Sequence, residues 1–334
     1  MSRIGTDSFD PASTPTQEPA AATGVAQPPP PMPQPHPQFW FEDGNVIIVV
    51  GNTKFRVHQS FLARKSPVFR SMLASHTEVT PTLHLCYNEN KFARFLGMLY
   101  NDVVIHDQYY PGLELVSIMV YFSKKYKVKQ YEDIARAHLS RLAPVDLFEW
   151  SDYNCPGTLV RTQEQRRIPC IRDLRWDRDC IAVANLARRL GGMSRLHCTA
   201  LYHCVQLSDQ LLLHGFSSDN KLSSEDRLRC VQARDKLLRA SYMVFHDIFI
   251  RIPELQCQTR EACKAACQRS RSHMATDTTG YWVTTRPLTA SKECEWLLNS
   301  ELGLCWVCKA SAFGQLKRLK QNMLDNLETY FLLQ

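Results

Sequence analysis

Cysteine is the residue type whose number and spacing in this sequence point most directly to chemistry. The 334 residues include 13 cysteines, and those from residue 257 onward are Cys257, Cys263, Cys267, Cys294, Cys305 and Cys308. Four thiolates arranged as two pairs can bind Zn²⁺ tetrahedrally, at Zn–S distances of about 2.3 Å. The set that best meets this requirement is Cys257, Cys263, Cys305 and Cys308. Cys267 lies one helical turn beyond Cys263 and is a substitute ligand.

Other roles for these thiols stay open. Cysteines also serve as small buried hydrophobic residues or as free thiols. Cys305 and Cys308 have the C-x2-C spacing of a redox pair, although no βαβ pattern surrounds them. An odd number of cysteines in a chain of this length argues against a disulfide scaffold and favours a reducing compartment. We therefore expect a cytoplasmic or nuclear protein, with structural zinc as the one cofactor that the spacing suggests.

Motifs for catalysis are absent from the sequence. It contains no Gly-rich phosphate loop, GxSxG, HExxH or dinucleotide fingerprint, and only 13 glycines. His58 has no nucleophile or carboxylate that the sequence places beside it, so we expect a buried, hydrogen-bonded structural histidine. Asp43 is expected to accept hydrogen bonds from backbone amides. We expect no enzymatic activity.

The elements that would position these residues begin with a β-hairpin. Val46–Val50 is a β-branched run typical of a buried strand, and Lys54–Val57 alternates polar and apolar residues. Gly51-Asn52-Thr53 between them has turn chemistry. Ser66 before Pro67 is the order of an N-cap and a first helical position. A third strand is expected at 83–85, and helices at 88–100, 113–125, 129–142, 178–190, 194–206, 208–213, 224–251, 260–271 and 316–331.

The stretch from Phe55 to Leu73, FRVHQSFLARKSPVFRSML, resembles the signature of the BTB/POZ family. In that signature a strand ends in Phe-x-x-His, followed by Leu, Ser-x-x-Phe and an apolar pair, with an acidic residue before the first strand. The residues that carry the resemblance are Asp43, Phe55, His58, Leu62, Ser66, Phe69, Met72, Leu99 and Tyr100. It implies an α+β fold, a small mixed sheet with a helical cluster, followed by a mostly α-helical C-terminal region.

The chain past residue 38 is also similar to the BTB proteins that are abundant in mushroom-forming fungi. Phe39–Val46, Leu196–Cys204 and Leu211–Gly215 carry this second resemblance. We expect three parts: a Pro-rich disordered tail at 1–38, a BTB/POZ domain at 39–148 and a helical region at 149–334. The tail, with Pro28–Pro31 in a row, is interpreted as a linker, or as a ligand for an aromatic-lined groove on another protein.

The resemblance implies a protein partner, either a second copy of the chain in a homodimer or a client of an adaptor or scaffold. Cullin binding is an alternative, although His76 stands where cullin-binding members have an apolar residue. A nuclear regulator that contacts nucleic acid is a second alternative, because residues 161–334 hold 26 Lys/Arg against 18 Asp/Glu, or +8. No membrane contact is expected, since the apolar stretch Leu113–Phe122 is short and interrupted by Glu114.

Overall fold

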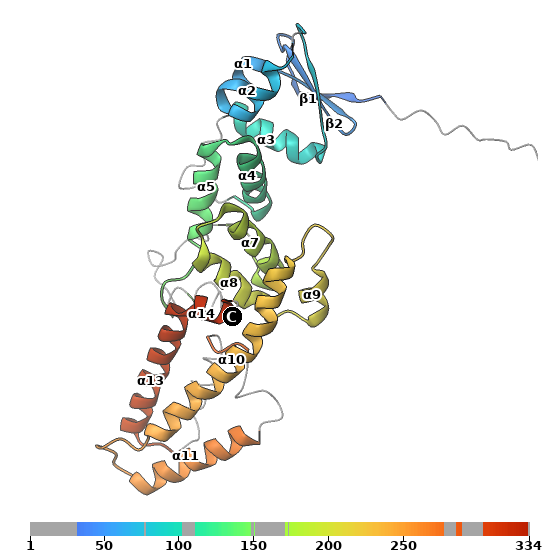
Figure 1. Ribbon diagram of the computed structural model, residues 1–334. Coiled ribbons are helices and arrows are strands. Elements are labelled where there is room, and N and C mark those ends of the chain that lie inside the picture. Colours follow the sequence, from blue (N-terminus) through green and yellow to red (C-terminus); the bar gives the residue numbers. More distant parts are fainter. Residues whose placement is uncertain are drawn as a thin grey trace, which may run out of the picture.

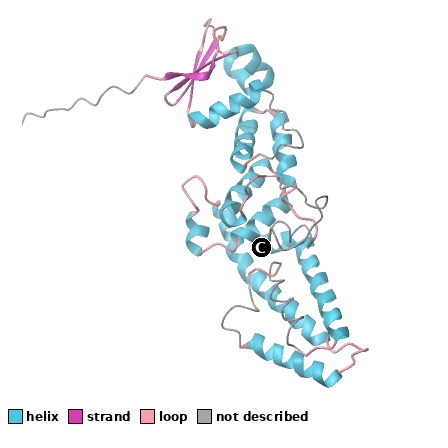
Figure 2. Cartoon of the chain, turned by 180° about the vertical axis from the view of Figure 1, so that it is seen from behind, coloured by secondary structure: helices cyan, strands magenta, loops and turns pink. Residues whose placement is uncertain are grey.

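The computed structural model describes residues 32–76, 78–101, 111–147, 150, 171–172, 174–276, 285–288 and 303–332. The molecule is elongated, with a small sheet and its helices at one end and helices alone along the rest of its length (Figure 1). Figure 2 shows that the described strands are confined to that one end. This arrangement confirms the predicted α+β class and the helical C-terminal region.

The sheet has four strands in the order β1-β3-β2-β4. The predicted hairpin is confirmed: β2 and β3 are antiparallel, and Ile48 pairs with Phe55 so that both side chains are buried. The outer strands run parallel to their neighbours, β1 to β3 and β4 to β2, which makes the sheet mixed. The strands are β1 (Gln34–Trp40), β2 (Val46–Val50), β3 (Thr53–Val57) and β4 (Thr82–Leu85).

The boundary of the tail predicted at residue 38 is wrong, because strand β1 begins at Gln34. Pro35 and Pro37 are compatible with this strand because β1 is at the edge of the sheet, where a missing N–H costs little. Packing supplies the stabilisation: Phe39 is buried, and the ring of His36 stacks on Phe55 at 5.0 Å. Residues 1–31 of the predicted tail lie outside the described residues.

An aromatic core joins the sheet to its helices. Phe69 stacks on Tyr126 at 4.2 Å, and Phe95 stacks on Phe122 at 4.7 Å. Ser66 caps α2 as predicted, since its Oγ accepts from the Phe69 N–H at 3.1 Å, and it donates to the Tyr126 carbonyl. These helices are α1 (Gln59–Lys65), α2 (Pro67–Ala74), α3 (Glu89–Asn101), α4 (Leu113–Tyr126) and α5 (Lys129–Ser140).

The C-terminal region is helical in every described element. The helix predicted at 316–331 begins earlier and is interrupted at Asn326, whose side-chain amide donates to the Asn322 carbonyl at 2.8 Å beside its own backbone N–H at 3.1 Å. The elements are α7 (Trp176–Leu190), α8 (Ser194–Cys204), α9 (Asp209–His214), α10 (Ser224–Arg251), α11 (Arg260–Ala275), α13 (Trp306–Asp325) and α14 (Leu327–Phe331).

The two parts of the chain are packed together. Arg136 on α5 donates from Nη1 to the Gly191 carbonyl at 2.8 Å and from Nη2 to the Leu190 carbonyl at 3.2 Å, at the end of α7. Arg195 on α8 donates to the Pro144 carbonyl at 2.9 Å. The buried residues of both parts belong to one continuous hydrophobic core.

A buried carboxylate links three helices of the C-terminal region. Asp226 lies in the first turn of α10 and is fully buried. Its Oδ2 is 3.2 Å from Nε2 of His197 on α8 and 3.5 Å from a guanidinium nitrogen of Arg188 on α7. Arg229 approaches its Oδ1 at 3.0 Å. Burial raises the pKa of Asp226, but the contacts with His197 and Arg188 outweigh it and lower that pKa below the ordinary value.

Candidate interaction surface and metal centre

Three of the predicted signature residues form a hydrogen-bonded chain at the edge of the sheet. Asp43, in the β1–β2 turn, places Oδ1 3.1 Å from Nε2 of His58. The other ring nitrogen of His58 is 3.1 Å from the Tyr100 hydroxyl, which also accepts from the His58 backbone N–H at 2.9 Å. Segments before β2, after β3 and at the end of α3 are thereby held together.

The expected partners of Asp43 and the expected burial of His58 need correction. The main partner of Asp43 is the His58 imidazole, whose contact lowers the pKa of the Asp43 carboxyl, and not a set of backbone amides. His58 is hydrogen-bonded as expected, but its side chain is 28% exposed because Asp43 lies at the surface. Burial raises the pKa of Tyr100, so its hydroxyl stays protonated. The arrangement therefore positions three segments and does not activate the Tyr100 hydroxyl as a nucleophile.

The remaining signature residues pack in the core. Ser66 and the side chains of Phe55, Leu62, Phe69 and Leu99 are all buried, and Met72 is half-buried against them. Their role is to fix the fold of this part of the chain.

The strand that the sequence interpretation missed, β1, contributes apolar surface. Trp40 at its end is 37% exposed, and Met32 just before it is 74% exposed. β1 pairs with β3 on one side only, so its outer backbone groups face no other described strand. Helix α1 carries a further aromatic group, since Phe61 stacks on Tyr100 with ring centroids 4.3 Å apart. The cations of Arg64 and Lys65 lie over the Phe61 ring.

Comparison with known families bears on this part of the molecule. Residues 41–141 match the family model described as BTB/POZ domain. This part of the chain is a BTB/POZ domain. The match agrees with the resemblance on which the fold was predicted, and a BTB/POZ domain is a protein–protein interaction module. A search of the curated proteins found no match to the chain.

The predicted cysteine ligands meet at the end of the molecule farthest from the BTB/POZ domain. Figure 1 shows the end of α10 and the starts of α11 and α13 together there. Cys257 precedes α11, and Cys263 lies in its first turn. Cys305 is the N-cap of α13, and Cys308 follows in its first turn. The four Sγ atoms all lie within 4.8 Å of one another, so the structure brings together the set that the spacing favoured.

The distances within the cluster suit a metal ion. Zinc bound at about 2.3 Å to four sulfurs of a tetrahedron separates those sulfurs by roughly 3.8 Å. The Cys257 and Cys305 Sγ atoms are 3.7 Å apart. No disulfide joins any of the cysteines in the described residues. The cluster can therefore hold a metal without a large rearrangement.

Backbone and hydroxyl groups surround the sulfurs. The Cys305 N–H donates to the Cys263 Sγ at 3.3 Å, and the Thr259 hydroxyl is 3.4 Å from the same sulfur. The Cys308 N–H donates to Cys305 and is the largest cause of the lowered pKa of Cys305, about 6. This N–H···S bond, at a helix N-terminus, stabilises the thiolate of Cys305, which is the form that binds a metal, whereas burial raises the pKa of Cys308.

Cys267, the substitute ligand, is not part of the cluster. It is buried one turn further along α11, and burial raises the pKa of its thiol to about 11. Cys263 belongs to the cluster and Cys267 does not, because the chain after Cys257 places the first turn of α11, and not the second, beside the start of α13.

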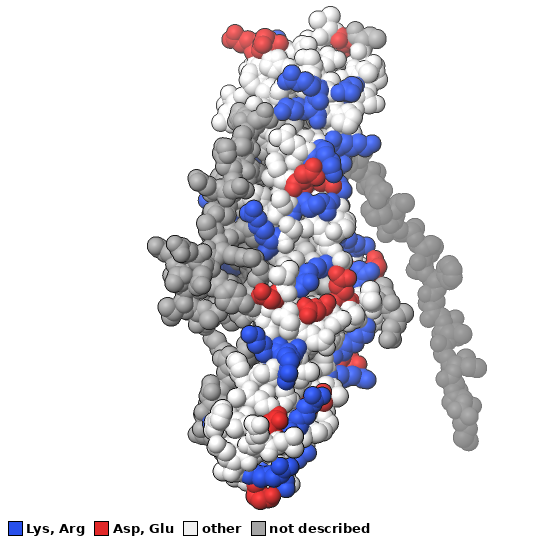
Figure 3. Space-filling view, turned by 90° about the vertical axis from the view of Figure 1, so that its left-hand side faces the viewer, with Lys and Arg blue, Asp and Glu red and all other residues white. Residues whose placement is uncertain are grey.

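Charge on the described surface is mixed. Figure 3 shows Lys and Arg side chains spread along the face in view, with Asp and Glu among them, and not gathered into one basic patch. This face gives no support to the nucleic-acid alternative, and the comparisons do not favour it. None of the described helices combines the length and apolar character needed to cross a bilayer.

Proposed function

We propose that the chain is a non-catalytic interaction protein that self-associates through its BTB/POZ domain and acts as an adaptor or scaffold. The observation that carries this proposal is the family match over 41–141, because the domain is an interaction module. We assign this role to the part of the chain that ends near residue 148, and a supporting role to the helical region from residue 149.

The exposed edge at β1 supports self-association. The edge strand offers C=O groups to a second chain, although Pro35 and Pro37 supply no N–H, and Trp40 and Met32 add apolar area beside it. Aromatic residues on such a surface are the residue type that most often dominates binding energy at protein interfaces. We infer a homodimer in which this edge lies at or near the interface.

Light scattering coupled to size exclusion, over a hundredfold range of concentration, tests the homodimer. We expect twice the monomer mass at high concentration, and a Trp40→Glu variant with at least tenfold weaker self-association, because the charge would be placed at the interface. Tyr242→Glu is the matched control, since Tyr242 is a similarly exposed aromatic residue on α10, at 42%. A monomer at all concentrations would contradict the proposed homodimer. Equal effects of the two variants would show that the interface does not include Trp40.

We also propose that Cys257, Cys263, Cys305 and Cys308 bind one structural Zn²⁺. The supporting observation is the convergence of four sulfurs within 4.8 Å from two segments that are distant in sequence. Four protein ligands leave no open position for a substrate, so the ion would hold helix ends together and not catalyse. Thiolate ligation persists in a reducing compartment, so we place the protein in the cytoplasm or nucleus.

Metal analysis of the purified protein tests the zinc proposal. We expect about one zinc per chain by mass spectrometry of metals, and less than a tenth of that in a Cys305→Ser variant, because a closed site needs all four ligands. Cys267→Ser is the control and should keep its zinc. Substitution with Co²⁺ should give the absorption of tetrahedral thiolate. A zinc-free protein that takes up no Co²⁺ would contradict the proposal.

A further inference from the structure

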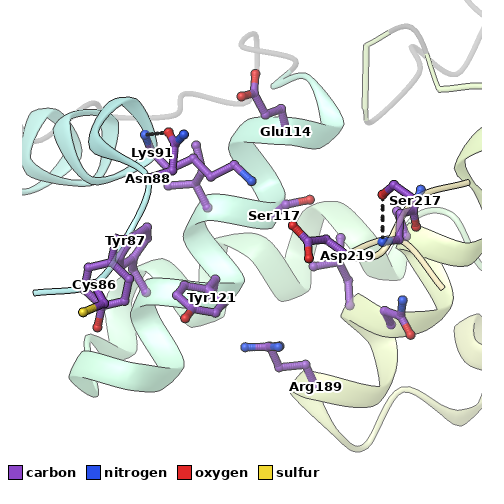
Figure 4. A pocket seen from close by; sticks show the side chains of 16 residues that line it. Cys86, Tyr87, Asn88, Lys91, Glu114, Ser117, Tyr121, Arg189, Ser217 and Asp219 are labelled. Atoms are coloured by element: carbon purple, nitrogen blue, oxygen red, sulfur yellow. Dashed lines mark hydrogen bonds between the residues drawn. The ribbon is translucent and has the colours of Figure 1, made fainter. Parts of the chain in front are cut away.

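A groove lies between the BTB/POZ domain and the C-terminal helices. It has a volume of about 790 Å³ and is lined by the segment before α3 and its first turn, by α4, by α7 and by the loop between α9 and α10. Tyr87 and Tyr121 form an aromatic wall, with ring centroids 6.1 Å apart. Figure 4 shows Tyr121, Lys91, Arg189 and Asp219 directed toward the space between these elements.

The groove carries cations that lack carboxylate partners. No carboxylate of the described residues forms an ion pair with Lys91 or with Arg189, whose guanidinium lies 4.9 Å from the Tyr121 ring centroid. Lys125 extends over the ring of Tyr87 at 4.7 Å. Among the acidic lining residues, Glu114 is already paired with Arg94, which leaves Asp219. Aromatic rings beside unpaired cations suit an acidic segment that carries an apolar side chain.

The chain itself contains such a segment outside the described residues. Among residues 1–31, Arg3 is the one cation, against Asp7, Asp10 and Glu18, and Phe9 is the one residue among Phe, Tyr and Trp. The sequence Asp7-Ser8-Phe9-Asp10 therefore offers an aromatic ring between two carboxylates.

The described chain starts close to the groove. At the start of β1, the Gln34 N–H donates to the Asn52 carbonyl at 2.8 Å. The Asn52 N–H in turn donates to Glu89, the neighbour of the groove residue Asn88, at 2.6 Å. A linker of 23 residues, from 11 to 33, can span at most about 80 Å. Residues 7–10 are therefore within reach of the groove in the same chain.

We propose that Asp7–Asp10 is a built-in ligand of this groove, with Phe9 against Tyr87 and Tyr121 and its carboxylates at Lys91 and Arg189. A tethered ligand acts at an effective concentration of about 1 mM, so a dissociation constant of about 0.1 mM would keep the groove mostly occupied. The bound segment would contact both the BTB/POZ domain and α7. It would also compete with any partner that presents an acidic, aromatic segment.

Competition between the built-in segment and a free copy of it tests this inference. The probe is a fluorescein-labelled peptide of residues 1–20, titrated with full-length protein and followed by anisotropy. We compare the unaltered chain with a tail variant, Asp7→Asn, Phe9→Ala and Asp10→Asn. Because the tail variant leaves its own groove vacant, it should bind the peptide about tenfold more tightly than the unaltered chain does.

Substitutions in the groove complete the test. Arg189→Glu, added to the tail variant, should weaken peptide binding at least tenfold, and so should Lys91→Glu on the opposite wall. Arg239→Glu is the matched control, because Arg239 is an exposed arginine of α10, 78% exposed, outside the groove. Equal peptide affinity of the unaltered chain and the tail variant, or of Arg189→Glu and Arg239→Glu, would overturn the proposal. Circular dichroism of each variant verifies that the fold is retained.

Discussion

Chelation of zinc is expected to lower the thermal unfolding midpoint of this protein by roughly 6 °C. A ligand present at a thousand times its dissociation constant stabilises the folded state by about 4 kcal/mol. With an unfolding entropy of roughly 2.1 cal/mol/K per residue, each kcal/mol shifts the midpoint of a 334-residue chain by about 1.4 °C. The cysteine cluster holds the start of α11 to the start of α13, so loss of the ion would release both helix ends. Differential scanning fluorimetry with and without a zinc-specific chelator measures the shift.

Controls separate loss of zinc from loss of packing. Re-addition of Zn²⁺ should restore the midpoint of the chelated protein. Cys305→Ser should have a low midpoint that chelator lowers no further, whereas Cys267→Ser should respond to chelator like the unaltered chain. If chelator leaves the midpoint of the unaltered protein in place, the cluster does not stabilise the fold through a metal.

Asp226→Ala is the second substitution for which we expect a large effect, a loss of about 2–3 kcal/mol in the free energy of unfolding. Hydrogen bonds to charged groups contribute about 1.5–3 kcal/mol each, and Asp226 is fully buried between three positively charged or polar partners. The expected loss in unfolding free energy is below the 3–5 kcal/mol typical of a broken buried ion pair. Arg188 and Arg229 are 42% and 25% exposed, so water can hydrate them once the carboxylate is removed.

Urea unfolding followed by far-UV circular dichroism measures the loss at Asp226. Asp226→Asn keeps the shape and should cost less than the alanine variant. Asp235→Ala is the control, because Asp235 pairs with Arg239 on the exposed face of the same helix, with a side chain 65% exposed. It should change stability by less than about 0.5 kcal/mol. Equal effects at positions 226 and 235 would show that the buried carboxylate does not link the helices.

The stabilisation by Asp226 also has a defined pH dependence. Its pKa in the folded protein lies below the ordinary value, so the unfolded chain takes up this proton first as the pH falls. The contribution is therefore fully present above the ordinary carboxyl pKa and is lost as the pH falls through the lower folded value. The difference in stability between the unaltered protein and Asp226→Asn should shrink over that acidic range.

Local patterns in the sequence were sufficient for the hairpin and for most helices. The β-branched run Val46–Val50 has no competing signal, and Ser66-Pro67 marks a helix start by chemistry that does not depend on the surroundings. β1 was missed because Pro35 and Pro37 lack the N–H that an inner strand needs. Proline is tolerated at the edge of a sheet, and the sequence does not show that β1 lies there. The break at Asn326 was missed because no glycine or proline marks it in the sequence.

The candidate sites also combine features that the sequence predicts with features that depend on tertiary packing. The cysteine spacing predicted the ligands that meet, but Cys263 and Cys267 share a helix face, so spacing alone left Cys267 as a substitute. The contact between Asp43 and His58 depends on how a turn and a strand end approach each other. The groove could not be found from the sequence, because its walls come from separate segments that only packing brings together.

The bonds from Arg136 to the last carbonyls of α7 have a mechanical consequence. They fasten the last helix of the BTB/POZ domain to the first described helix beyond it, so the joint is braced against bending. In a homodimer each subunit would then act as a stiff arm, with its cysteine cluster held at a set distance from the symmetry axis. A client with two binding elements could occupy both subunits only if the distance between those elements matched the distance between the arms. The dimer would then select clients by length as well as by chemistry.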